Sequence, residues 1–360
     1  MAPAGHWLVW LRLLCCVAVL RACSPGCHCQ VESFGMFGSF SLTKVDCSGL
    51  GPHMTAIPIP LDTSYLDLSS NTLTSVSMAM FRGPGYTTLA NLDLSHNGIS
   101  QLSPDTFSKL RYLEALNLSH NSLETLENGI FSNLPLGEVD LSHNRLRQVN
   151  LDAFSSSRGH GKPLTVNLSA NHISWLGWNL DRATPNIYTL DLSGNRLDRV
   201  PTAWLARVPL RWLSLAGNPI TTIGDKAFSG LQELTDLSLS GLTHLTELSR
   251  GAFNGLHNLQ QLDLSLSPRL RALDAAVFSG LDSLRELNLS GSGVSGLPRG
   301  ALELLPAIGR IWVGGSALRC GTTAREGSFH RQFGFVKRQQ ELRCLEADGA
   351  PAAQYTVRLR

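Results

Sequence analysis

Six cysteines are the residues whose types and spacing most plainly indicate chemistry, and they lie near the two ends of the chain. Four follow the pattern C-x3-C-x-C-x17-C and two come late, namely Cys23, Cys27, Cys29, Cys47, Cys320 and Cys344. Clustered thiolates can bind zinc, but zinc motifs favour paired CxxC or Cys/His spacings. The other two of the eight cysteines, Cys15 and Cys16, lie in an apolar N-terminal segment that is predicted below to be a secretory signal peptide. An even number of cysteines confined to the ends of the remaining, exported chain favours disulfides. We therefore expect disulfide-bonded caps, no metal ion and no cofactor.

Three histidines form a second candidate group, because they recur in the same tetrapeptide, LSHN. They are His96, His120 and His143, spaced 24 and 23 residues apart. Three imidazoles on neighbouring strands are potential zinc ligands, but a tetrahedral site is hard to build from one straight column. LSHN is also a frequent filler of the repeat described next. We interpret these histidines as structural, with each ring lying over a turn.

The elements that position these residues are leucine-rich repeats. Residues 113–126, LEALNLSHNSLETL, match LxxLxLxxNxLxxL, in which LxL is a short strand and the asparagine bonds the following turn. The asparagine recurs every 23 to 27 residues, at Asn71, Asn97, Asn121, Asn144, Asn171, Asn195 and Asn218. Four later copies keep the apolar pairs Leu237/Leu239, Leu262/Leu264, Leu287/Leu289 and Ile311/Val313. Eleven stacked repeats predict a leucine-rich repeat solenoid, an α/β horseshoe with a parallel β-sheet on its concave face.

The repeats also predict what lies away from the sheet. Phenylalanines recur in five of the outer turns and should point into the core, namely Phe107, Phe154, Phe228, Phe253 and Phe278. Two irregular insertions, residues 82–86 and 155–163, are rich in Gly, Pro or polar residues and are interpreted as mobile loops. Repeats eight and nine carry one extra residue after the strand, which should bulge the turn.

The domain organisation follows from these patterns. Residues 1–22 are predicted to be a secretory signal peptide, because residues 7–20 are apolar and small residues follow, with cleavage expected after Ala22. Residues 23–62 form a cysteine-rich cap, residues 63–318 the eleven repeats, and residues 319–360 a C-terminal cap and a tail expected to be disordered. No later stretch is apolar enough to span a membrane, so we expect a secreted protein that is not inserted in the bilayer. The net charge of +2 comes without any nucleic-acid-binding motif.

Side chains between the strand leucines should face outward, and equivalent positions should stack into columns about 4.8 Å apart per strand. The side chains of the central column are mostly Asp and Asn, and the column ends in Trp312. The Asp and Asn side chains are either solvated residues typical of the repeat or an acidic surface for a basic partner. Near the C-terminal end, Trp212, Asp236, Arg310 and Trp312 combine aromatic rings with charge. Such residues anchor protein interfaces, so we predict a partner site there.

Three N-glycosylation sequons begin at Asn117, Asn167 and Asn288, all in the central column. Glycans there would stand on the concave face and crowd its N-terminal half. The sequence contains no nucleophile elbow and no phosphate-binding glycine loop, so we do not expect an enzyme.

The cysteine pattern, the signal peptide, the repeats and the late cysteine pair together resemble the small leucine-rich proteoglycan family. The segments FGMFGSFSLTKVDCSGLGPH, IPIPLDTSYLDLSSN and GPGYTTLANLDLSHN make the likeness more specific than the repeat does. The resemblance covers essentially the whole mature chain. The x17 spacing is longer than in the collagen-binding members, and no acidic Ser-Gly site precedes the cap. Both departures weaken any transfer of a chondroitin chain.

The resemblance implies a function and a cysteine pairing. It implies a secreted protein that binds bone morphogenetic protein, transforming growth factor beta, fibroblast growth factor, Wnt/Frizzled or Notch-ligand components and tunes their signalling. The alternative is a structural matrix protein that binds collagen fibrils. By analogy with the family's caps, Cys23 would pair with Cys29, Cys27 with Cys47, and Cys320 with Cys344.

Overall fold

A computed structural model describes residues 23–34, 40–51, 57–131, 134–155, 162–177 and 184–316, and four short strands beyond them. The predicted signal peptide, residues 1–22, lies outside the described residues, as does Cys320. The chain divides into two compact units. Unit 1 comprises residues up to Val166 together with Trp178–Asn186, and unit 2 comprises Asn167–Gly177 and Ile187–Arg360.

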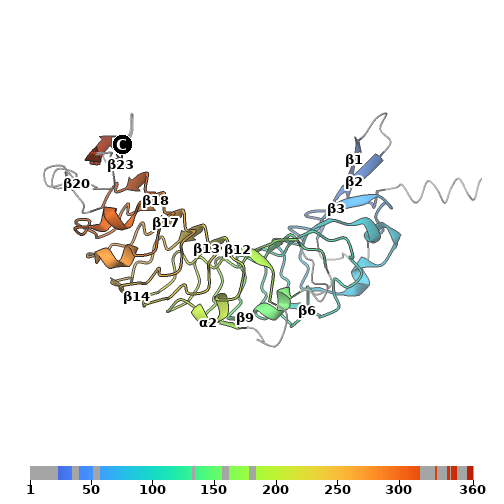
Figure 1. The fold of residues 1–360 in the computed structure, drawn as a ribbon. Helices are drawn as coiled ribbons and strands as arrows, with labels where there is room; N and C mark the ends of the chain where they lie inside the picture. Colours follow the sequence, from blue (N-terminus) through green and yellow to red (C-terminus); the bar gives the residue numbers. More distant parts are fainter. Residues whose placement is uncertain are drawn as a thin grey trace, which may run out of the picture. The chain divides into compact units, whose positions relative to one another are not determined.

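In unit 1 the LxL segments pair side by side as short strands (Figure 1). Strands β2, β3, β5, β7 and β8 run parallel, with the strand leucines in register from one repeat to the next. The elements are β1 (His28–Phe34), β2 (Phe40–Asp46), β3 (Thr63–Asp67), β4 (Ser75–Val76), η2 (Met78–Phe81), η3 (Pro84–Thr88), β5 (Asn91–Asp93), β6 (Gln101–Leu102), β7 (Ala115–Asn117), β8 (Glu138–Asp140), β9 (Gln148–Asn150) and η4 (Leu151–Phe154). Strand β10 (Leu164–Asn167) spans the boundary between the units.

Unit 2 repeats the same construction. Strands β12, β13, β15, β17, β18 and β19 are parallel and in register. The elements are β11 (Trp175–Gly177), β12 (Ile187–Asp191), α2 (Thr202–Leu205), β13 (Trp212–Ser214), β14 (Thr222–Ile223), β15 (Asp236–Ser238), β16 (Glu247–Leu248), β17 (Gln261–Asp263), η5 (Ala275–Phe278), β18 (Glu286–Asn288), η6 (Ala301–Leu304), β19 (Arg310–Trp312), β20 (Phe329–His330), β21 (Gln339–Gln340), β22 (Leu342–Glu346) and β23 (Tyr355–Leu359). The sequence predicts a disordered tail, whereas β23 pairs antiparallel with β19 and β22.

The repeat asparagines connect each repeat to the one before it. Asn121, for example, donates from Nδ2 to the carbonyls of Leu94 and Leu118 at 2.9 and 3.1 Å, and its Oδ1 accepts the backbone N–H of Ile99 at 3.0 Å. Leu94 and Ile99 belong to the preceding repeat, so one buried amide satisfies backbone groups of two successive turns. This accounts for the recurrence of asparagine, because its side chain carries both a donor and an acceptor.

The phenylalanines of the outer turns are buried, as the sequence predicts. Phe107, Phe228, Phe253 and Phe278 are each at most 1% exposed and Phe154 is 5% exposed. In unit 1, ring centroids of successive phenylalanines lie 5.5 to 6.3 Å apart. The rings therefore fill the side of the coil opposite the sheet, where leucines alone would leave space.

The extra residue of repeats eight and nine is accommodated by a tight turn. Leu242 and Ser267 take the place of the repeat asparagine, and their carbonyls accept the N–H groups of Leu245 and Leu270 at 2.9 and 3.1 Å. Leu242 is buried. The amide ladder therefore ends at Asn218, and hydrogen-bonded turns take over the local backbone.

The insertion at residues 82–86 is ordered, so the mobile loop predicted there is wrong. Pro84–Thr88 form a 3-10 helix in which Tyr86 is 3% exposed and its hydroxyl donates to the Ile57 carbonyl at 2.8 Å. A Cβ at Gly85 would lie 2.3 Å from the Ile59 carbonyl oxygen, so only glycine allows this close approach. A buried tyrosine thus pins the segment down. Most of the other insertion, residues 156–161, lies outside the described residues.

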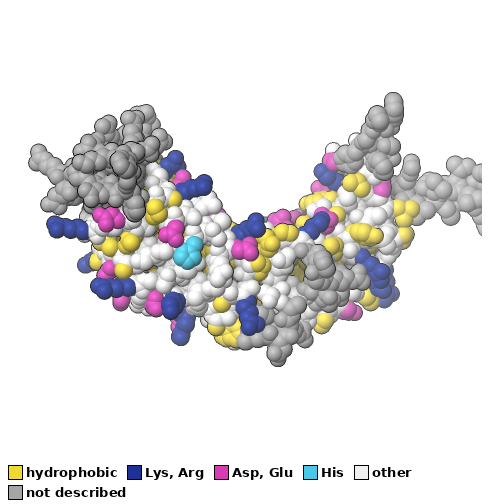
Figure 2. Space-filling model, viewed as in Figure 1, with side chains coloured by type: hydrophobic (Ala, Val, Ile, Leu, Met, Phe, Trp, Pro, Cys, Tyr) yellow, Lys and Arg dark blue, Asp and Glu magenta, His cyan; other side chains and the backbone are white. Residues whose placement is uncertain are grey.

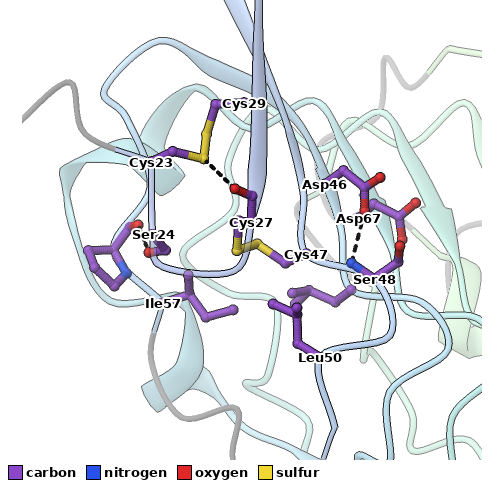
Figure 3. Close-up of a disulfide and its surroundings, with 12 residues drawn as sticks. Cys23, Ser24, Cys27, Cys29, Asp46, Cys47, Ser48, Leu50, Ile57 and Asp67 are labelled. Carbon is purple, nitrogen blue, oxygen red and sulfur yellow. Dashed lines mark hydrogen bonds between the residues drawn. A yellow bond between two sulfur atoms is a disulfide. The ribbon is translucent and has the colours of Figure 1, made fainter.

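The N-terminal cap is an antiparallel hairpin of β1 and β2 that is cross-linked internally by two disulfides (Figure 3), and β2 pairs with β3 of the first repeat. Cys23 bonds Cys29, and Cys27 bonds Cys47, which is fully buried. These are the two N-terminal pairings that the family resemblance implies. The predicted partner of Cys344, Cys320, lies outside the described residues. The cap covers the open end of the leucine core, because β2 pairs with β3 and its Val45, together with Cys47, is buried there.

Candidate partner-binding surface

The Asp and Asn side chains of the central column stabilise the turn that follows each strand. In eight repeats, and at Asp46 in the cap, the Asp or Asn at this position accepts, through Oδ1, the backbone N–H of the residue two positions later, at 2.8 to 3.1 Å. Asp46 shows the electrostatic consequence, because the backbone N–H and side chain of Ser48 lower the pKa of its carboxyl. The recurrence of Asp and Asn therefore reflects turn formation, because both side chains carry an Oδ1 that can accept this N–H.

All three sequon asparagines take part in this pattern. The Oδ1 atoms of Asn117, Asn167 and Asn288 accept the N–H groups of the residues two positions later. The Nδ2 of Asn117 also donates to Asp93 Oδ2 at 3.1 Å. All three side chains are half-buried. Glycosylation at these positions remains a prediction.

Unit 1 has a small hollow on its sheet face, with about 140 Å³ of space. It is lined by Tyr65, Asn91, Asp93, Asn117, Glu138 and Asp140, among others. Burial raises the pKa of the Tyr65 hydroxyl, and the carboxylates of Asp67, Asp93 and Asp46 add to the shift. The hollow is acidic, and its only described aromatic side chain is Tyr65.

Unit 2 has a larger hollow, with about 260 Å³ of space, between the strands that carry two tryptophans. Trp212 of β13 and Trp312 of β19 stand at its two sides, and Asp236, Asp263 and Glu286 lie between them. Strand register explains this grouping, since Trp212 pairs with Asp236, Gln261 follows, and Glu286 and Arg310 complete the same column. We call this surface the Trp212–Trp312 hollow.

One predicted partner residue, Arg310, is already engaged within the protein. Its Nη1 donates to Glu286 Oε1 at 3.0 Å, and its guanidinium lies 5.1 Å from the centre of the Trp312 ring. Arg310 therefore orients Trp312 and does not line the hollow. The charge that remains for a partner is negative and comes from Asp236 and Asp263.

The structure thus brings together Trp212, Asp236 and Trp312 of the predicted partner-binding residues, and places the Arg310 guanidinium against the Trp312 ring. The hollow is also lined by Asp263 and Glu286, which were not among the partner-binding residues predicted from the sequence. Their repeat positions were the available signal, because register alone puts them between the two tryptophans.

The three histidines form a stack in unit 1. The ring centroids of His96 and His120 are 4.2 Å apart and those of His120 and His143 are 4.1 Å apart, with nearly parallel planes. Each residue has a φ near +53°, the left-handed turn conformation. Burial and the two neighbouring imidazoles lower the pKa of His120. Within the described ranges, no group of three His, Cys, Asp or Glu side chains is arranged to hold a metal ion.

Comparisons with known proteins identify both the type of repeat and the relatives of the whole chain. A family model described as "Leucine rich repeat" matches residues 87–146, 185–245 and 241–294. The chain is 54% identical to Tsukushi of Gallus gallus over 92% of its length and 89% of that protein. It is 50% identical to Tsukushi of Homo sapiens over 94% of its length and 95% of that protein. It is 51% identical to Tsukushi of Xenopus tropicalis over 98% of its length and 99% of that protein.

A solved structure shows the same fold. The chain matches one titled "Crystal structure of LRIM1/APL1C complex" with a TM-score of 0.55 and 22% identity, over 74% of this chain and 47% of that one. The described part of the chain has no helix with the length and apolarity that crossing a bilayer requires. Half or more of the residues are identical to each of these Tsukushi proteins over nearly their full length. The chain belongs to the Tsukushi family of leucine-rich repeat proteins.

Proposed function

We propose that this chain is a secreted protein that modulates extracellular signalling by binding growth factors, morphogens or their receptors. Membership of the Tsukushi family supports this proposal. A predicted signal peptide and two disulfides near the start of the mature chain support secretion, because structural disulfides persist in oxidising compartments. Candidate partners are bone morphogenetic protein, transforming growth factor beta, fibroblast growth factor, Frizzled and Notch ligands.

The observation that carries the proposal is the Trp212–Trp312 hollow. Two partly buried tryptophans flank outward carboxylates on a sheet whose strands are held rigidly by repeat packing. Tryptophans are the residues most enriched among interface hot spots. A cation placed there gains attraction from the ring face and from Asp236 and Asp263 together. The hollow therefore fits a loop of the partner that carries Lys or Arg.

The proposal describes binding without catalysis. Its effect on signalling should scale with the molar ratio of this protein to its ligand. Turnover of a substrate by strongly substoichiometric protein would contradict it.

The experiment measures binding of the full-length secreted protein to a panel by surface plasmon resonance. The panel comprises bone morphogenetic protein, transforming growth factor beta, a Frizzled ectodomain and fibrillar collagen. For a growth factor or receptor that binds, Trp312→Ala should weaken binding by at least about 2 kcal/mol, roughly thirtyfold. Trp212→Ala should have a similar effect, and both variants are first shown to be folded by circular dichroism and melting.

A charge variant separates recognition from folding. Asp263→Ser removes the charge but keeps an oxygen that can accept the Ser265 N–H, now bonded to Asp263 at 2.9 Å, as Ser214 Oγ accepts the Ala216 N–H at the equivalent position. Serine is chosen because asparagine there would create an N-glycosylation sequon with Ser265. The variant should weaken binding a few-fold, the size expected for an exposed ion pair of about 0.5–1 kcal/mol. The matched control is Asp140→Ser, because Asp140 has the same backbone role in unit 1. If Asp140→Ser weakens binding and the tryptophan variants do not, the site lies on unit 1. Binding to collagen alone would favour the matrix alternative.

A further inference from the structure

A second hollow lies on the side of unit 1 opposite the sheet, beside the ordered insertion. It contains about 430 Å³ of space and is lined by side chains from η2, η3 and the next outer turn. Its floor is made by Phe81 and Tyr86, whose rings meet edge to face with centroids 5.7 Å apart. Met78 and Tyr112 form its walls. We call it the Tyr112 pocket.

The floor of the Tyr112 pocket is rigid, because Tyr86 is fixed from below. Its hydroxyl donates to the Ile57 carbonyl at 2.8 Å, and the neighbouring Thr88 hydroxyl donates to the Leu61 carbonyl at 2.8 Å. The ring of Phe81 also packs 6.0 Å from Phe107 in the core. A hollow supported in this way is preformed, as binding pockets usually are.

The segment that forms one wall of the Tyr112 pocket differs in sequence from the equivalent segments of other repeats, and packing of the core does not require the difference. Residues 109–113 read KLRYL, whereas the same outer turn reads GLQEL, GLHNL and GLDSL at residues 230–234, 255–259 and 280–284. Tyr112 thus stands where other repeats have a polar residue, and its side chain is 66% exposed. Aromatic side chains contribute much of the energy of protein interfaces, so an exposed ring beside an aromatic floor can hold an aromatic residue of a partner.

The rim of the pocket is positively charged. Arg82, Lys109 and Arg111 all line it and are exposed, and no acidic side chain does. None of the three forms an ion pair with any residue that the structure describes. Figure 2 shows Lys and Arg side chains beside hydrophobic ones on the outer side of this unit. Three free cations around an aromatic hollow attract a negatively charged group with an apolar centre.

We propose that the Tyr112 pocket binds an acidic peptide segment of a partner protein through one aromatic anchor residue. The anchor ring packs against Phe81, Tyr86 and Tyr112, and the flanking carboxylates meet Arg82, Lys109 and Arg111. This site lies in unit 1 on the side opposite the sheet, so it is independent of the Trp212–Trp312 hollow. The two hollows have opposite charge and select different partner segments.

The test uses the full secreted chain and a fluorescein-labelled peptide with one tyrosine flanked on each side by three acidic residues. Fluorescence anisotropy at 150 mM NaCl should show saturable binding. Replacing the peptide's tyrosine by alanine should weaken binding at least tenfold, as should Tyr112→Ala or Arg111→Glu in the protein. Tenfold corresponds to about 1.4 kcal/mol. Because Tyr112 and Arg111 are exposed, these variants should keep the melting temperature of the wild type.

Matched controls separate the pocket from general charge and apolarity. Arg147→Glu reverses an exposed charge of unit 1 outside the pocket, as Arg111→Glu does inside it, and Leu266→Ala removes an apolar side chain that is 60% exposed in unit 2. Both should bind the peptide within twofold of wild type, as should Trp312→Ala. Equal loss with Arg147→Glu and Arg111→Glu would overturn the proposal in favour of diffuse electrostatic adhesion. Binding to phosphatidylserine vesicles but not to the peptide would overturn it in favour of a lipid ligand.

Discussion

Replacing Asn121 by leucine should show how strongly the hydrogen bonds of a repeat asparagine stabilise unit 1. Leucine is chosen because Leu242 occupies the equivalent position in a later repeat and is buried there. The substitution keeps the branched shape of the side chain and removes four hydrogen bonds: those from Nδ2 to the carbonyls of Leu94, Leu118 and Ser119, and the one from the Ile99 N–H to Oδ1. Each of the three carbonyls keeps another donor, namely Asn97 Nδ2, Asn144 Nδ2 and the His96 N–H respectively. Nδ2 has only two hydrogens to share among them, so two losses of about 1 kcal/mol each are expected on this side.

The third loss is larger. The Ile99 N–H is buried and loses its acceptor, which costs about 1–3 kcal/mol. The expected total is about 3–5 kcal/mol, measured from urea denaturation followed by far-ultraviolet circular dichroism. Hydrogen exchange should also accelerate at the Ile99 amide. Ser122→Ala, a neighbour with a half-buried side chain, should change stability by less than about 0.5 kcal/mol. A loss below about 1 kcal/mol for Asn121→Leu would refute the reasoning that the Asn121 hydrogen bonds stabilise the contact between neighbouring repeats.

Three further outcomes are expected. Cys47→Ser breaks the disulfide that closes a loop between positions 20 residues apart and should cost about 2–4 kcal/mol in urea denaturation, with a free Cys27 thiol found by peptide mapping. Tyr86→Phe leaves the Ile57 carbonyl without the hydroxyl and should cost about 1–3 kcal/mol, whereas an unchanged urea midpoint would mean that the insertion is not held by this bond. Because burial and neighbouring imidazoles lower the pKa of His120, the unfolded chain binds its proton more readily, so stability falls as the pH drops below about 6.5. His120→Gln should lose less stability than wild type between pH 7.5 and pH 5, and an identical loss would contradict this.

The amino-acid sequence alone predicts the repeats, the buried phenylalanines and the asparagine positions. This is possible because burial in a solenoid follows the chain's own period, so a leucine in one repeat faces the same environment as its equivalent in the next. The outward direction of Trp212, Asp236 and Trp312 follows from the same alternation. The pairing of Cys27 with Cys47 needed the family resemblance, since cysteine counting leaves the connectivity open.

Other features were decided only by the tertiary structure, because they depend on neighbours that no period specifies. Glycine and proline at residues 82–86 suggest a loop, but a tyrosine hydroxyl that reaches the Ile57 carbonyl turns the segment into a pocket floor. The sequence predicts that Arg310 contacts a partner, yet Glu286 on the neighbouring strand forms an ion pair with Arg310 at 3.0 Å. Hydrogen bonds and ion pairs form between particular atoms at particular distances. A repeating pattern fixes which side chains face outward, and only the folded chain determines which of them meet.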